Sequence, residues 1–151
     1  MCAADGSNPV QLTSFGTRVP DAPRWSPDGQ RIAFAALVAS NNRDIYVVGA
    51  DGGAPRRLTT EPSEEGRPGW SQDGRWIYFR SDRSGSQQIW KMPAEGGPPV
   101  QVTRTGGFEA FESPDGKLLY YTKGRQTPGL WSMPVGGGEE TRVLEKVLSN
   151  Y

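Results

Sequence analysis

Short apolar runs, separated by glycine, proline and polar residues, recur along the whole 151-residue chain. Three of them begin one residue after an Asp-Gly pair and cover Arg31–Ala35, Trp76–Phe79 and Leu118–Tyr121. Runs of about four to eight residues, bounded by turn residues and rich in β-branched and aromatic side chains, are typical of strands. Because the runs are apolar at consecutive positions, both faces of each strand are expected to be covered. The pattern therefore predicts short strands joined by tight turns.

The turn that precedes each run belongs to a longer repeat. Trp25–Gly29 (WSPDG) recurs as Trp70–Gly74 (WSQDG) and as Glu112–Gly116 (ESPDG), and the aspartates are 45 and 42 residues apart. After each turn and run come a second apolar run, a glycine-rich turn and a short strand-like tail, always in this order. The second runs are Asp44–Val48, Gln88–Met92 and Gly129–Met133, and the tails are Arg57–Thr59, Gln101–Thr103 and Arg142–Leu144. An additional tail stands alone at Gln11–Thr13.

Each unit is predicted to contain four antiparallel strands, a to d. Asp-Gly turns join a to b, because Asp can bond to the backbone two residues on and Gly accepts a positive φ. Four-stranded repeats of about 40 to 45 residues are the signature of β-propeller blades. The predicted fold class is therefore all-β: three four-stranded antiparallel blades and an orphan N-terminal outer strand, not closed into a ring.

The predicted boundaries follow the repeat. Residues 1–8 are expected to be a flexible N-terminus, and residues 145–151 a tail or the start of a further blade. The propeller region spans residues 9–144, with an outer strand of a preceding blade at 9–14 and blades at 22–60, 67–104 and 109–144.

Three blades are too few for a closed propeller, which needs about four to eight. An open arc exposes the apolar faces of its end blades, so these surfaces require a partner. Two explanations remain open: the chain is a fragment of a longer protein, or copies associate. Two copies would contribute six blades.

The repeat resembles that of the TolB-like β-propeller family. The resemblance lies in the Trp-Ser-Pro-Asp-Gly turn, the apolar run, the Ile-Tyr or Ile-Trp strand, the Asp-Gly-Gly turn and the Leu-Thr tail, and it covers residues 9 to 144. It implies the propeller fold and suggests a periplasmic or envelope location, although the compartment stays unknown. The sequence departs from the pattern at Gln72, Glu112 and Gly136, and Glu112 puts a carboxylate where the other blades have Trp.

Composition and charge exclude several classes of function. The chain carries 17 Lys and Arg against 17 Asp and Glu, which argues against a nucleic-acid partner. No apolar run approaches the ~20 residues of a membrane span, so no membrane insertion is expected. Without histidine and with one cysteine, the chain lacks a Ser-His-Asp triad and a Cys or His zinc site. Asp28, Asp73 and Asp115 occupy equivalent turn positions in the three units, so we interpret them as turn residues rather than as a metal or acid-base site. We therefore expect no catalytic residues, no cofactor and no metal.

Recognition of a partner is expected at the b–c loops and d–a linkers, where the units differ from one another. Variable loops on a rigid scaffold commonly carry binding sites. Hydrogen-bonding and charged side chains suited to a protein or peptide are Asn41, Asn42, Arg43, Asp82, Arg83 and Arg125. The segment Asp82–Ser86 offers too few oxygen ligands for a calcium site.

Three functions are compatible with the sequence. The first is a non-catalytic propeller scaffold that binds a protein or peptide through the loop face. The second is the propeller gate of a prolyl-oligopeptidase-type hydrolase whose catalytic domain lies outside these residues, since no G-x-S-x-G motif occurs here. The third is a metal-dependent propeller hydrolase with Glu112 as the nearest candidate carboxylate.

Overall fold

The computed structural model describes residues 5–14, 20–39, 42–124 and 126–145. Within these residues twelve strands form three four-stranded sheets, and no helix has the length and apolar character needed to cross a bilayer. The strands are β1 (Pro20–Trp25), β2 (Arg31–Ala39), β3 (Asn42–Gly49), β4 (Gly52–Arg57), β5 (Glu65–Trp70), β6 (Trp76–Ser81), β7 (Gln88–Pro93), β8 (Val100–Gln101), β9 (Glu109–Glu112), β10 (Leu118–Thr122), β11 (Leu130–Pro134) and β12 (Thr141–Leu144).

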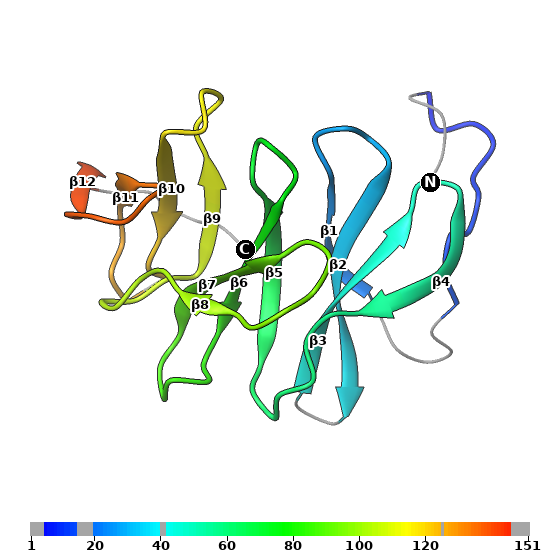
Figure 1. Ribbon diagram of the computed structural model, residues 1–151, viewed down its shortest axis with the longest axis horizontal. Helices are drawn as coiled ribbons and strands as arrows, with labels where there is room; N and C mark the ends of the chain where they lie inside the picture. The colour runs from blue at the N-terminus through cyan, green and yellow to red at the C-terminus, as the bar shows by residue number, and fades with distance from the viewer. Residues whose placement is uncertain (1–4, 15–19, 40–41, 125, 146–151) are drawn as a thin grey trace.

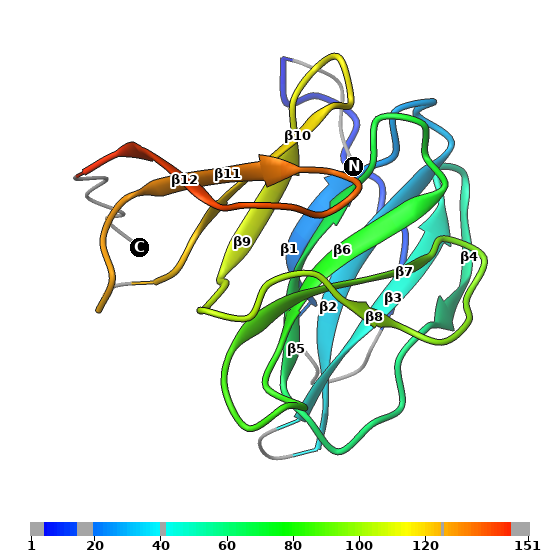
Figure 2. The ribbon, with the colours of Figure 1, turned by 60° about the vertical axis from the view of Figure 1, so that its left-hand side comes forward.

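Each sheet is one blade, with its strands antiparallel and in chain order. Blade 1 is β1–β4, blade 2 is β5–β8 and blade 3 is β9–β12, and Figure 1 shows them side by side in that order. In Figure 2 the third sheet is splayed outward, so the arc is open on that side. The prediction of three antiparallel blades that do not close a ring is confirmed.

Side chains alternate between the two faces of each blade. In blade 2, Ile77 and Phe79 pack against Ala33 and Ala35 of blade 1, while Tyr78 packs toward blade 3. We call the face toward the preceding blade the leading face and the opposite one the trailing face. Buried side chains of this size contribute about 1.5–3 kcal/mol each. Each blade is therefore stabilised mainly by its neighbours.

The a–b turn is closed by a serine and an aspartate inside the same blade. The Ser71 hydroxyl donates to Asp73 Oδ1 (2.6 Å) and accepts from the Trp76 amide (2.9 Å), while the Arg75 amide donates to Asp73 (3.0 Å). The same bonds form from Ser26 and from Ser113. The Ser71 hydroxyl lowers the pKa of Asp73 by stabilising its charged form. These contacts support the interpretation of the aspartates as turn residues.

The N-terminal segment differs from its predicted form. Residues 9–14 are in no strand, although Leu12 packs against the leading face of blade 1. Leu58 and Val102, at the same place in the repeat, pack against the two seams between blades. Leu12 therefore lies where the outer strand of a preceding blade would place it. Its segment forms no ladder because the described residues include no preceding blade with which it could pair.

The predicted C-terminal tail at 145–151 lies outside the described residues except for Glu145, which is exposed at the end of blade 3.

Replacing Ser71 by Ala should lower the free energy of unfolding by about 0.5–1.5 kcal/mol, because a part-buried amide and an exposed carboxylate lose their shared partner. Urea denaturation followed by tryptophan fluorescence measures this change. Ser84→Ala, in the exposed β6–β7 loop, is the matched control and should change stability little. Equal effects of the two substitutions would contradict the structural role of the turn serine.

Candidate binding site

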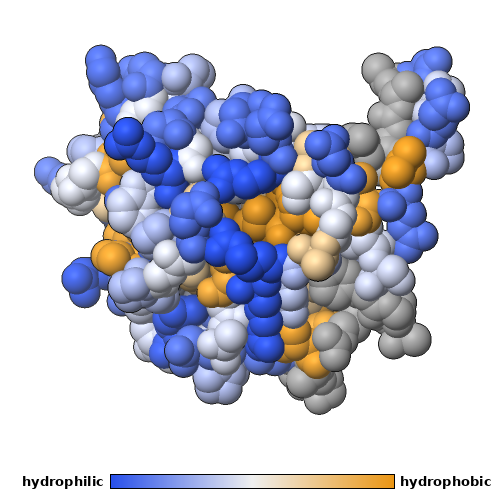
Figure 3. Space-filling model, turned by 45° about the vertical axis from the view of Figure 1, so that its right-hand side comes forward, coloured by the Kyte–Doolittle hydropathy of each residue, from blue (hydrophilic) through white to orange (hydrophobic). Residues whose placement is uncertain are grey.

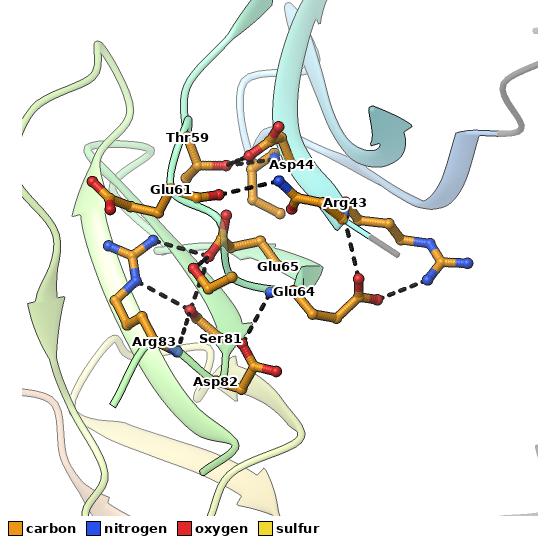
Figure 4. Close-up of polar contacts among 12 residues, drawn as sticks. Arg43, Asp44, Thr59, Glu61, Glu64, Glu65, Ser81, Asp82 and Arg83 are labelled. Atoms are coloured by element: carbon orange, nitrogen blue, oxygen red, sulfur yellow. Dashed lines mark hydrogen bonds and ion pairs between the residues drawn. The ribbon is translucent and has the colours of Figure 1, made fainter. Parts of the chain in front are cut away.

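The b–c loops and d–a linkers lie at the end of the blades opposite the Ser-Asp turns, and we call this end the loop face (Figure 1). At the junction of blades 1 and 2, the linker after β4 runs past the start of β3 and the β6–β7 loop. Charged residues from all three segments meet there (Figure 4). The junction is therefore the part of the loop face with the most extensive polar contacts in the described chain.

Glu65 is the buried centre of this junction. Its Oε1 accepts from the hydroxyls of Ser63 and Ser81, the latter at 2.9 Å, and from Arg83 Nη2 at 3.1 Å. The Arg83 guanidinium also lies over the rings of Phe79 and Trp90, and its side chain is only 14% exposed. Burial raises the pKa of the Glu65 carboxyl, against the opposing effects of the hydroxyls and Arg83. A buried pair of this kind fixes the linker rather than presenting free charges.

The neighbouring Glu64 ties the linker to both blades. Its carboxylate accepts from Arg43 Nη1 at 2.7 Å and from the Arg43 amide at 3.2 Å, and Arg80 Nη2 lies 3.6 Å away. Its own amide donates to Asp82 Oδ1 at 3.0 Å. Arg43, Arg80 and Arg83 are therefore all held in ion pairs with Glu64 or Glu65.

A groove opens beside this network. It has a volume of about 490 Å³ and is lined by Glu61, Pro62, Ser63, Asp82, Arg83 and Gly85. Glu61 and Asp82 are exposed at its edge, whereas Arg83 is turned into the ion pair with Glu65. The accessible charges of the groove are thus carboxylates, which attract cations and accept hydrogen bonds.

Four of the six predicted site residues gather at this junction. Arg43, Asp82 and Arg83 make the contacts above, and the Asn42 side chain donates to the Glu61 carbonyl at 3.2 Å. Asn41 and Arg125 lie outside the described residues. The sequence did not single out Ser63, Glu65 or Ser81 as binding residues, because no local pattern distinguishes a buried carboxylate from a solvated one. The one sequence feature that indicated this cluster was the acidic character of the linker after β4.

The described residues contain no cluster of three or more histidine, cysteine or acidic side chains that could hold a metal ion. Asp82, considered above for calcium, instead accepts the Glu64 amide, and the Ser84 hydroxyl donates to the Ser86 carbonyl.

Glu112 forms part of the seam between blades 2 and 3. It accepts from the Tyr78 hydroxyl at 2.7 Å and from the Gln72 amide at 2.8 Å. At the equivalent place in the first seam, the Trp70 indole donates to the Arg24 carbonyl at 3.0 Å. Burial, together with the Glu112 carboxylate, raises the pKa of the Tyr78 hydroxyl far above its ordinary value. The carboxylate thus joins two blades in place of the indole, and its known contacts are structural.

Comparison with known proteins identifies similar chains. The family model described as the TolB beta propeller domain matches residues 10–150. An uncharacterized protein of Agrobacterium fabrum, Atu1656, is 36% identical over 99 residues, covering 64% of this chain and 33% of that protein. The Tol-Pal system protein TolB of Bordetella pertussis is 40% identical over 139 residues, covering 62% of this chain and 31% of that protein. The chain thus spans about a third of the length of these curated relatives.

Solved structures share the fold. TolB from Acinetobacter baumannii superposes with a TM-score of 0.77 at 25% identity, covering 97% of this chain and 37% of that chain. A prolyl endopeptidase structure superposes with a TM-score of 0.65 at 20% identity, covering 89% of this chain and 23% of that chain. The second likeness shows the fold alone, so structural similarity by itself does not separate scaffold from enzyme.

The buried carboxyl predicts a specific pH dependence. The pKa of Glu65 is higher in the folded chain than its ordinary value of 4.5, so the folded state binds more protons above that pH. The contribution of Glu65 to the free energy of unfolding should therefore fall as the pH rises from 4.5 through the pKa of the carboxyl in the folded state. Urea denaturation from acid to neutral pH measures the free energy of unfolding of both proteins. The value for the wild type minus the value for Glu65→Gln should fall with rising pH.

Glu61→Gln removes an exposed carboxyl from the same linker and controls for the change in charge. A Glu65→Gln stability curve parallel to that of the wild type would contradict the raised pKa.

Proposed function

Because the chain belongs to the TolB β-propeller domain family, whose model covers residues 10–150, we propose that it is a non-catalytic scaffold that binds a protein or peptide through its loop face. The observation that supports this most directly is the groove at the junction of blades 1 and 2. It is set in a linker fixed to both blades by the contacts of Glu64 and Glu65. A groove held in this way costs little ordering entropy when a ligand binds.

The charge distribution at the groove favours a partner segment that carries cations or hydrogen-bond donors. Arg43 and Arg83 were expected to face the partner, but their guanidinium groups are paired with Glu64 and Glu65. In this proposal they position the linker, while Glu61 and Asp82 contact the partner. Asn42 supports the same linker through its bond to the Glu61 carbonyl.

The relatives suggest an envelope setting. One of them is called a Tol-Pal system protein, and we extend to this chain the proposal of an envelope-associated, protein-binding role. Since the chain covers about a third of that relative, the partners and location of the whole protein belong to the proposal as well.

The scaffold is preferred over the enzymatic alternatives because of the contacts that the candidate groups make. Glu112, the residue considered for a metal-dependent hydrolase, is engaged by Tyr78 and Gln72 in the seam between two blades. The gate of a hydrolase remains compatible with the fold, but no contact in the described residues favours it specifically.

Short fluorescent peptides that are lysine-rich, neutral or glutamate-rich test the site by fluorescence anisotropy. The lysine-rich peptide should bind most tightly, and added salt should weaken it. Reversing both edge charges, Glu61→Lys with Asp82→Lys, should weaken binding by about three- to tenfold, as expected for two surface ion pairs.

The matched control reverses two exposed carboxylates at the other end of the blades, Asp51→Lys with Glu139→Lys. It changes the net charge equally and should leave binding nearly unaltered. Equal loss in both double variants, or equal binding of the three peptides, would refute the proposed site.

A further inference from the structure

The seam between blades 2 and 3, the second seam, contains a pocket at the end that carries the Ser-Asp turns. It has a volume of about 390 Å³, and its wall includes Asp73, Trp76, Lys91, Glu112, Asp115 and Val135. Trp76 and Lys91 belong to β6 and β7 of blade 2, and Glu112 ends β9 of blade 3. The two blades therefore build the pocket together, with an aromatic ring supplied by one and a carboxylate by the other.

This pocket differs in kind from the apolar surface on the leading face of blade 1. Figure 3, with the blade 1 side of Figure 1 turned forward, shows that surface as hydrophobic residues among hydrophilic ones. Ile32 and Phe34 in this face are equivalent in the repeat to Ile77 and Phe79, which pack against blade 1 in the first seam. Such a face is made for stacking against another blade, whereas the pocket lies between two blades that are both described.

The first seam, between blades 1 and 2, shows what fills the equivalent place there. Arg31 stands at the repeat position of Trp76, and Trp70 at that of Glu112. The Arg31 guanidinium crosses the seam, where it lies 4.8 Å from the centroid of the Trp70 ring and 2.6 Å from Glu95 Oε1. At this place in the first seam, a guanidinium thus contacts both an aromatic ring and a carboxylate.

The second seam keeps the ring and the carboxylate, but no arginine is among the residues that line its pocket. Trp76 now supplies the ring and Glu112 the carboxylate. Because a carboxylate is much smaller than an indole, its place in the repeat leaves room beside it. The second seam therefore offers the two groups that hold a guanidinium in the first seam, with space between the blades.

The three departures from the repeat meet at this pocket. Gln72 stands where the other blades have proline, and its amide, which proline would lack, donates to Glu112 Oε2 at 2.8 Å. Gly136 follows Val135 of the wall and replaces the acidic residue that is Glu95 in the first seam. A Cβ on Gly136 would meet nothing within 4 Å, so packing does not require the glycine. The side chain that ties down the arginine of the first seam is thus missing at the mouth of the pocket.

The charges of the pocket favour a cation. Its wall carries the carboxylates of Asp73, Glu112 and Asp115 against the single ammonium of Lys91. Hydrogen bonds from the turn serines lower the pKa of Asp73 and of Asp115, which keeps both charged at neutral pH. The Lys91 ammonium lies 4.9 Å from the centroid of the Trp76 ring and forms no ion pair in the described part of the chain. The net charge of the wall is therefore negative.

Glu112 retains hydrogen-bonding capacity for a ligand. Its Oε1 accepts from the Tyr78 hydroxyl at 2.7 Å, and its Oε2 accepts from the Gln72 amide. Each carboxylate oxygen can accept two hydrogen bonds, so one remains on each. The two existing bonds fix the plane of the carboxylate, which suits the two parallel bonds that a guanidinium donates.

We propose that the pocket in the second seam binds an arginine side chain of a polypeptide partner. The guanidinium packs on the Trp76 ring and donates to both oxygens of Glu112, as Arg31 joins a ring and a carboxylate in the first seam. A guanidinium is planar and suits both contacts, whereas an ammonium is a point charge. Lys91 opposes the ligand by its like charge. The inference does not rest on the proposed function, since the loop-face groove lies at the other end of the blades.

Titration of N-acetyl-arginine-methylamide into the ¹⁵N-labelled protein, followed by NMR, tests the pocket. The compound has the peptide bonds of a residue within a chain. Among the indole N–H signals, that of Trp76, identified by its loss in Trp76→Phe, should shift most. The matching lysine and citrulline compounds should bind at least about threefold more weakly, because lysine lacks the planar pair of donors and citrulline lacks the charge.

Two substitutions should change the affinity in opposite directions. Glu112→Gln keeps the size of the side chain and should weaken binding of the arginine compound by about three- to tenfold. Lys91→Met removes the competing cation and should tighten binding by about two- to threefold. Asp51→Asn, at an exposed carboxylate at the same end of blade 1, is the matched control and should leave the affinity unchanged. Urea denaturation establishes that each variant is folded.

Weaker binding to Lys91→Met would make the lysine a donor to a ligand of another class and would overturn the proposal. Equal binding of the three compounds, or equal effects of Asp51→Asn and Glu112→Gln, would also overturn it. Shifts confined to signals of the loop face would refute the pocket in the second seam and leave the proposed function standing.

Discussion

The structure depends on one constraint: each small sheet is apolar on both faces and cannot bury either face by itself. Ile77 and Phe79 point to one side of β6 while Tyr78 points to the other, so blade 2 is stable only between two neighbours. The radial order of the blades, the packing of Leu12 and the exposure of Trp25 all follow from this requirement. Within the described residues the end blades meet the same requirement on one side only, and their outer faces expose apolar side chains such as Trp25 and Phe111.

Polar contacts stabilise the turns at one end of the blades and the linker at the other end. At the Ser-Asp turns the serine and aspartate bonds remain within one blade and give every repeat the same shape, while Gln72 and Arg31 add bonds across the seams. At the loop face they run between blades, where Glu64 and Glu65 connect the linker to arginines on β3 and in the β6–β7 loop. The groove at the junction of blades 1 and 2 is therefore formed by a linker that both blades hold in place. The groove depends on the seam, so binding there and cohesion between blades 1 and 2 are linked.

The blades were predictable because their information is local and repeated. The spacing of the Asp-Gly turns defines the strands on either side, and the alternation of apolar residues defines their faces. Burial of Glu65 was not predictable, because its contact with Arg83 depends on how two separate segments pack. Glu112 attracted a chemical hypothesis for the same reason: its sequence position reveals the loss of a tryptophan but not the Tyr78 hydroxyl opposite it. The outer strand predicted at residues 9–14 has the expected position, shown by Leu12, without the pairing, since pairing needs a second strand.

The substitution of an indole by a carboxylate also bears on how such proteins diversify. Trp70 and Glu112 perform the same joining task with opposite hydrogen-bonding roles, one as a donor and the other as an acceptor. Gene duplication can therefore copy a whole blade, with its self-contained turn, while the joints on either side drift independently. Because each seam uses its own hydrogen-bonding groups, a copied blade fits only beside a neighbour that supplies the matching donor or acceptor. The position of a blade in the chain is thus specified partly by the hydrogen-bonding groups of its neighbours.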